Sequence, residues 1–161
     1  MLVRKTRSSG RRKKKQKARE AYVSHVIRVR SWEFYFSRRA TDPNSKWETG
    51  LFSDIANLTL IGDVVRPAES KFRTGKLTLN GGGDVKVKQP EHRLTAIGSA
   101  TAHGDEIEGY IWVSEERLRL LLIAAQSGQL QFAHFAGPKL RYRGAIVNSV
   151  SIGTHFDEDE W

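Results

Sequence analysis

Short segments rich in β-branched and aromatic residues recur along this chain, and clusters of Gly, Asn, Asp and Pro separate them. These segments predict strands at 23–37, 58–65, 76–79, 85–88, 94–101, 107–113, 130–135 and 140–153. Turns are predicted at 80–84 (NGGGD), 102–105 (AHGD) and 136–139 (AGPK). Closely spaced strands joined by short turns are typical of an antiparallel β-sandwich or barrel. We therefore expect a mainly β domain.

One helix, at about 114–127, is expected to interrupt the strands. Ser114 is a good N-cap, and Gly128 can end the helix. Apolar residues fall on one face and are joined by others that widen it, namely Leu118, Leu121, Leu122 and Ala125, then Leu120, Ile123 and Ala124. So wide an apolar face predicts either burial inside the domain, which we favour, or a homo-oligomer contact through helix 115–126.

The net charge of +9 is distributed very unevenly. Residues 1–20 contain ten Lys or Arg and one acid, which is a net charge of +9, whereas residues 21–161 contain seventeen basic and seventeen acidic residues. Four of those acids lie within residues 157–161, so residues 21–156 alone carry +4. The pattern predicts a disordered polybasic arm (1–20), one β-rich domain (21–156) and an acidic C-terminal tail (157–161).

The arm is the strongest functional signal in the sequence. Its density of positive charge suits contact with nucleic-acid phosphates, DNA or RNA, without sequence preference. The candidate binding residues are Arg4, Lys5, Arg7, Arg11, Arg12, Lys13, Lys14, Lys15, Lys17 and Arg19. Two alternatives stay open: contact with another polyanion or an anionic membrane surface, and an arm with no direct binding role.

The predicted domain could add a binding surface of its own. Alternation along 23–37 would place Arg28 and Arg30 on one face with three aromatic residues, Trp32, Phe34 and Phe36, with a bulge or break near Ser31. Single-stranded nucleic acids bind such basic and aromatic surfaces. The favoured interpretation, however, is that these aromatics belong to the core. Lys71 and Arg73 are further candidates for phosphate contact.

No catalytic residue, metal ligand or cofactor site is predicted. The chain has no Cys, which excludes disulfides, cysteine-ligated zinc and thiol catalysis. Its five histidines lack metal-ligand spacing: His25, His92, His103, His134 and His155. Glu106 and Glu108 share a strand face, but they are more simply explained as exposed acids. Neither a P-loop nor a nucleophile elbow is present.

Localisation follows from equally limited signals. The sequence contains no run of eighteen apolar residues, so no membrane span is expected. The basic N-terminus lacks the apolar stretch of a secretory signal. We expect a cytoplasmic protein, or a nuclear one in a eukaryotic cell, because residues 11–15 (RRKKK) suit a nuclear localisation signal.

From sequence we therefore expect a non-enzymatic protein that associates with nucleic acid through its arm. The alternative is a self-assembling, coat-like or scaffold-like protein whose arm neutralises nucleic acid. An enzyme is the third hypothesis, and it would need a site built from residues far apart in the chain.

Overall fold

The computed structural model describes residues 22–40, 44, 52–81 and 96–155. These residues form eight strands and one helix: β1 (Tyr22–Ala40), β2 (Phe52–Arg66), β3 (Thr74–Gly81), β4 (Gly98–His103), β5 (Glu106–Val113), α1 (Glu115–Gln126), β6 (Phe132–Pro138), β7 (Gly144–Val147) and β8 (Ser149–Gly153). The prediction of a mainly β fold with one helix is confirmed. The predicted arm, the strand at 85–88 and the acidic tail lie outside the described residues.

All described strands belong to one sheet with the order β7-β4-β5-β3-β2-β1-β6-β8. Its neighbours are antiparallel except for β3 and β5, which are parallel. The sheet is thus mixed, whereas the sequence predicts antiparallel order. The parallel pair arises because β5, the second strand of the β4–β5 hairpin, lies between β4 and β3. It pairs antiparallel with β4 on one side and parallel with β3 on the other. That hairpin turns at Gly104, whose φ of 63° is easily adopted only by glycine.

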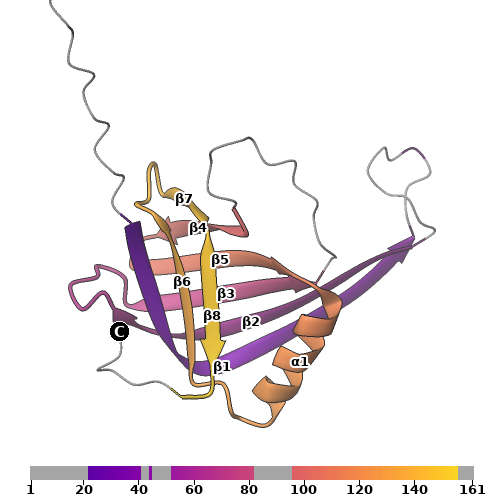
Figure 1. The fold of residues 1–161 in the computed structure, drawn as a ribbon. Helices are drawn as coiled ribbons and strands as arrows, with labels where there is room; N and C mark the ends of the chain where they lie inside the picture. Colours follow the sequence, from indigo (N-terminus) through magenta and orange to yellow (C-terminus); the bar gives the residue numbers. More distant parts are fainter. Residues whose placement is uncertain (1–21, 41–43, 45–51, 82–95, 156–161) are drawn as a thin grey trace, which may run out of the picture.

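The sheet is strongly curled but not closed. Its two edge strands, β7 and β8, are separated in the chain only by Asn148, whose N–H donates to the carbonyl of Ala136 (2.9 Å). The segment 140–153, predicted as one strand, therefore divides between the two edges of the sheet. In Figure 1, β6 and β8 pass steeply across β3 and β5. The turn predicted at 136–139 falls largely within β6, and the chain turns afterwards, at 141–143.

The core lies inside this curl. In β3 buried and partly exposed residues alternate strictly, as expected for a strand with one face inward. The largest fully buried side chains come from six strands: Val26, Ile27, Leu58, Leu60, Leu77, Leu79, Ile107, Ile111, Phe135 and Val147. Helix α1 adds Leu118 and Ala125 to the same cluster. The hydrophobic effect on these side chains is the main force that holds the sheet curled.

Helix α1 is capped as predicted, because the N–H of Arg117 donates to the Ser114 hydroxyl (3.3 Å) and Gly128 follows with φ of 70°. Its apolar face is only partly covered. Leu121 and Leu122 are half-buried, and the side chains of Leu120 and Ile123 are 57% and 56% exposed. The expectation that this wide face is buried is therefore wrong for Leu120 and Ile123, since the sheet covers one side of the helix only.

Candidate functional site

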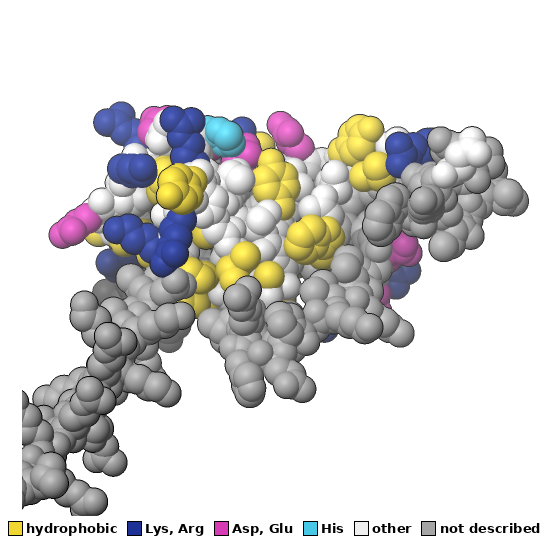
Figure 2. Space-filling model, turned by 90° about the horizontal axis from the view of Figure 1, so that it is seen from above, with side chains coloured by type: hydrophobic (Ala, Val, Ile, Leu, Met, Phe, Trp, Pro, Cys, Tyr) yellow, Lys and Arg dark blue, Asp and Glu magenta, His cyan; other side chains and the backbone are white. Residues whose placement is uncertain are grey.

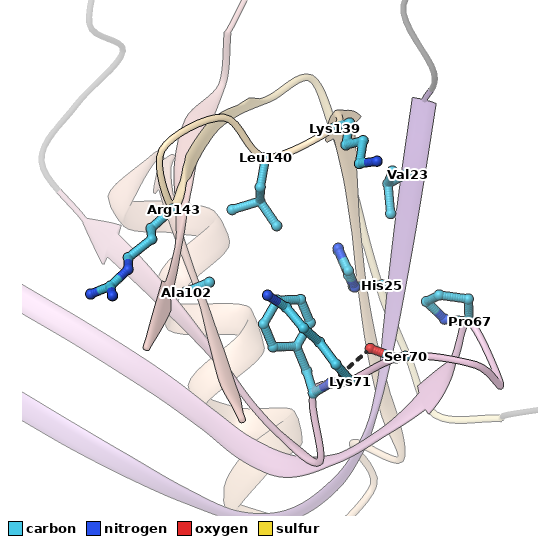
Figure 3. A pocket seen from close by; sticks show the side chains of 10 residues that line it. Val23, His25, Pro67, Ser70, Lys71, Ala102, Lys139, Leu140 and Arg143 are labelled. Carbon is cyan, nitrogen blue, oxygen red and sulfur yellow. Dashed lines mark hydrogen bonds between the residues drawn. The ribbon is translucent and has the colours of Figure 1, made fainter. Parts of the chain in front are cut away.

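A pocket of about 300 Å³ opens at the end of the sheet where β1 begins. Figure 3 shows its walls, which are contributed by Val23, His25, Pro67, Ser70, Lys71, Phe72, Ala102, Lys139, Leu140 and Arg143. These residues come from four parts of the chain: the start of β1, the link between β2 and β3, the end of β4 and the link between β6 and β7. The pocket thus depends on the complete curl of the sheet.

Two tight links shape the pocket rim. In the β2–β3 link, the N–H of Phe72 donates to the hydroxyl of Ser70 (3.1 Å), and the Phe72 side chain is buried in the core. In the β6–β7 link, Tyr142 and Arg143 both have positive φ, 51° and 70°. Such backbone is costly for residues other than glycine. Two backbone hydrogen bonds between Arg141 and Gly144 close the turn (2.8 and 2.9 Å), and the N–H of Ala102 donates to the carbonyl of Arg143 (2.9 Å). The turn places the rim residue Arg143 opposite Lys139 (Figure 3).

His25 forms the polar part of the pocket wall. Its side chain is 6% exposed, and its Nδ1 is buried without a hydrogen-bond partner in the described residues. The ring packs between Phe72 and Phe135, with centroid distances of 5.7 and 5.5 Å. Burial, and secondarily the nearby His134, lower the pKa of His25 to about 4. The imidazole is therefore neutral at neutral pH, with one ring nitrogen that donates a hydrogen bond and one that accepts.

Three cationic side chains surround this apolar and imidazole wall. The Lys71 ammonium lies 5.1 Å from the centroid of the Phe72 ring, in cation–π geometry, and reaches into the pocket (Figure 3). Lys139 lies at the rim near Val23, and the guanidinium of Arg143 points outward. No Asp or Glu is among the described residues that line the pocket. The pocket therefore presents positive charge over an apolar floor, which suits an anionic ligand with an apolar part.

The same end of the domain is basic at its surface. Figure 2 shows Lys and Arg side chains gathered at one end of the sheet, whereas hydrophobic side chains are scattered over the rest of that face. Besides the pocket residues, the links at this end carry the exposed residues Arg73 and Arg141. The chain enters the domain here, at Tyr22, next to Val23 of the pocket. Residues 1–20 are therefore attached to this basic end of the described domain.

The structure places the predicted binding residues differently. The ten arm cations, Arg4 to Arg19, lie outside the described residues. Of the domain candidates, Lys71 and Arg73 lie in the basic link between β2 and β3, and Lys71 lines the pocket. Arg28 lies opposite Asp63 in the sheet register, and Arg30 forms a salt bridge with Asp63. Arg30 is therefore already paired within the sheet.

The predicted basic and aromatic face is not continuous. The register between β1 and β2 shifts between Val29 and Ser31, which confirms the predicted bulge and reverses the alternation. Trp32 lies opposite the buried Leu60 and so faces inward, whereas Arg28, opposite Asp63, faces outward. The interpretation of the aromatics as core is also wrong in part. Trp32, Phe34 and Phe36 lie on the core side but remain 37%, 43% and 57% exposed.

The two carboxylates on β5 are explained by a cation beside them. Lys76 Nζ lies 3.0 Å from Glu106 and 3.7 Å from Glu108, and the hydroxyl of Tyr110 donates to Glu108 (2.8 Å). The hydrogen bond to Glu106 is the main cause that raises the pKa of Lys76. This arrangement is a surface ion-pair network on the outer face of the sheet. In the described part of the chain, no cluster of three His, Asp or Glu side chains could hold a metal ion.

Comparison with known proteins assigns neither a family nor a function to this chain. No model of a known protein family, no curated protein and no solved structure matches the chain. Across the described ranges, none of the structure's helices has the length and apolar character needed to cross a membrane. The functional argument therefore depends on the pocket, the surface charge and the sequence of residues 1–20.

Sequence reasoning found only part of this site. It identified Lys71 as a candidate but missed His25 and, more than 110 residues later in the chain, Lys139 and Arg143. A partial signal existed, because basic residues recur at 139, 141 and 143 directly after a turn sequence. Nothing in the sequence relates that segment to the start of β1, since their proximity follows from the pairing of β1 with β6.

Proposed function

We propose that this protein is a non-enzymatic nucleic-acid-binding protein in which residues 1–20 and the basic end of the domain contact the same phosphate backbone. One observation carries the proposal: the segment with ten cations joins the domain at Tyr22, beside a pocket lined by Lys71, Lys139 and Arg143. Adjacent positive groups on an arm and on a folded surface act on one polyanion together and raise the effective concentration of each.

The contact we propose is independent of sequence. An extended cationic segment offers no fixed geometry to read base edges, and phosphate contacts alone carry no sequence information. The folded part adds orientation, because Lys71 and Lys139 are held at the pocket by the links that carry them. This arrangement does not require outward-facing aromatic side chains on which the bases of a single strand would stack.

Fluorescence anisotropy with a labelled oligonucleotide tests the proposal. Removal of residues 1–20 should abolish most binding, and Lys71→Ala with Lys139→Ala in the full chain should weaken it several-fold. The matched control is Arg117→Ala with Arg119→Ala on α1, which removes the same charge from exposed positions away from the pocket. Thermal unfolding of each variant establishes that the domain is folded.

Two results would contradict the proposal. Equal binding by the full chain and the truncated domain would mean that the arm is not the main element. Absence of binding by either at moderate salt would remove nucleic acid as the ligand altogether.

A second function is favoured by a separate observation on α1. The exposed side chain of Leu120 lines a shallow depression of about 340 Å³ together with Leu121, Val150 and Ile152, and the exposed Ile123 lies three residues further along α1. Such an apolar surface suits self-association, as in a coat-like or scaffold-like protein. Size-exclusion chromatography with light scattering distinguishes the two proposals, because this one requires a defined oligomer that Leu120→Glu disrupts.

A further inference from the structure

The pocket at the basic end has a property that backbone phosphate contact does not use. A flat cationic surface is sufficient for phosphates, but this cavity has an apolar interior formed by Val23, Phe72, Ala102 and Leu140. Its volume of about 300 Å³ is at the lower end for small-molecule sites, roughly 300–1,000 Å³. A ligand that fills it must therefore be compact and carry both an apolar and an anionic part.

The second property is the orphaned ring nitrogen of His25. Buried polar atoms in folded proteins almost always have a partner, and each exception calls for an explanation. Nδ1 of His25 has no partner among the residues that the structure describes, although the side chain is 94% buried and lines the pocket. In contrast, Ser70 in the same wall accepts a hydrogen bond from the N–H of Phe72. Because this nitrogen is itself covered, a polar group of a bound ligand would satisfy it once the imidazole turns toward the cavity.

The third property is the arrangement of charge around that nitrogen. Lys71 reaches into the pocket and Lys139 lies at its rim, so an anionic group at the mouth could contact both while the rest of the ligand faces His25 (Figure 3). No carboxylate among the described lining residues would repel such a group or neutralise these cations. Two ammonium groups on flexible side chains beside an apolar wall are suited to an organic phosphate.

We propose that this pocket binds one phosphate monoester bearing a ring-sized group, with the phosphate on Lys71 and Lys139 and the ring group against Leu140 and His25. A free mononucleotide and the phosphorylated end of a nucleic-acid strand both have this chemistry. The choice of a nucleotide over other organic phosphates rests on the proposed function. The geometry of the pocket stands independently of it.

Isothermal titration calorimetry of the full chain with adenosine 5′-monophosphate tests the proposal. We expect saturable binding of one nucleotide per chain, with adenosine and inorganic phosphate each binding at least about tenfold more weakly, because each lacks one half of the ligand. Binding of inorganic phosphate as tight as that of the nucleotide would overturn the role of the apolar wall.

Substitutions within the pocket then locate the ligand. His25→Phe keeps a ring of similar size but removes the orphaned nitrogen, so nucleotide affinity should fall about tenfold while the domain remains at least as stable. Leu140→Trp, in a link at the rim, should block the cavity without a change in charge. Lys71→Ala with Lys139→Ala should weaken binding at least about tenfold, and the control Arg117→Ala with Arg119→Ala less than about twofold. Equal losses in the two double variants, or unchanged affinity in both His25→Phe and Leu140→Trp, would overturn the assignment.

Competition experiments separate the two sources of the ligand and the two proposals. A 5′-phosphorylated oligonucleotide that displaces the mononucleotide better than its unphosphorylated counterpart identifies the strand end as the occupant. Oligonucleotide binding without displacement identifies a free nucleotide. If oligonucleotides bind and the mononucleotide does not, the pocket proposal fails and the proposed function stands. If the mononucleotide binds and no oligonucleotide does, the proposed function fails and the pocket proposal stands.

Discussion

The imidazole of His25 packs edge-on against the ring of Phe72, with 5.7 Å between the centroids and 68° between the planes. On its other side lies Phe135, one of the most deeply buried residues of the core. An ionised imidazole in this position would lose its hydration without an acidic partner in the described pocket wall. Because of this packing, the stability of the core depends on whether the His25 imidazole is protonated.

Acidification should destabilise the domain through His25. Burial lowers its pKa from 6.5 to about 4, so the unfolded chain binds more protons between these values. The contribution of neutral His25 is fully present above pH 6.5 and is lost as the pH falls towards 4, by at most about 3 kcal/mol. Urea unfolding at pH 7.5 and pH 4.5 measures the loss. His25→Phe should lose less stability than the wild type over this range, and an identical loss would exclude His25 as the cause.

Truncation of two leucines of α1 should change the stability of the domain by very different amounts. Leu118 is 4% exposed and packs against Gly81 of β3, so Leu118→Ala should lower the free energy of unfolding by about 2–5 kcal/mol. Leu120 is 57% exposed, so Leu120→Ala should change it by less than about 0.5 kcal/mol. Chemical denaturation at low protein concentration compares the two. A large effect of Leu120→Ala that grows with protein concentration would instead indicate that α1 lies at a subunit contact.

The secondary structure could be predicted largely from local patterns. Alternation in β3 separates Leu77 and Leu79 from Lys76 and Thr78, and this pattern identifies both the strand and its inward face. The helix could be predicted equally well, because its cap at Ser114 depends on neighbouring residues alone. Such features need no knowledge of distant parts of the chain.

Features that depend on pairing could not be predicted in this way. The sequence predicts a bulge near Ser31 but not its effect on the two faces: the bulge reverses the face that every later residue of β1 occupies, so Arg28 and Trp32 lie on opposite faces. The parallel pairing of β3 with β5 also depends on a choice of neighbours that periodicity does not record. The pocket was missed for the same reason, since His25 and Lys139 meet only through the order of strands in the sheet.

Close contact between β6 and β7 should make one glycine irreplaceable. A Cβ at Gly137 would overlap the carbonyl oxygen of Ile146, a backbone atom that cannot rotate away. Gly137→Ala should therefore cost about 1–3 kcal/mol or more of stability. Gly144→Ala is the control, because a Cβ there meets nothing closer than 3.9 Å, and it should be neutral or stabilising by up to about 1 kcal/mol. Thermal unfolding of both variants tests this prediction. Equal stabilities would contradict the close approach of Gly137 to the backbone of Ile146.

Nucleic-acid affinity should depend steeply on salt. Each duplex phosphate that is neutralised contributes about 0.9 to the slope of log affinity against log salt. Because not all ten arm cations will reach phosphates, we expect a slope of magnitude about 4–8 for the full chain. Anisotropy titrations from low to moderate salt measure it, and a scrambled oligonucleotide of equal length should give the same values. A slope near 1 would contradict contact through the arm.

The acidic tail should oppose this binding. Asp157, Glu158, Asp159 and Glu160 carry four negative charges on the same chain as the arm and can compete for it at low salt. Replacement of these four residues by Asn and Gln should tighten binding at low salt, and the difference should vanish as salt screens the attraction. The same titrations provide the measurement, and weaker binding by the neutralised chain would exclude competition.

The division of residues 144–153 between the two edges of the sheet has a consequence for synthesis on the ribosome. Until this segment leaves the exit tunnel, β4 lacks its partner β7 and β6 lacks its partner β8. The nascent chain therefore carries two open strand edges at once, and unpaired edges recruit other strands. One side of β1 must also wait for β6, more than 100 residues later, although β2, β3, β5 and β4 can already pair with one another. Cells that make this protein should depend on chaperone protection of the incomplete sheet, and ribosome-bound chains halted before residue 144 should be the most prone to aggregate.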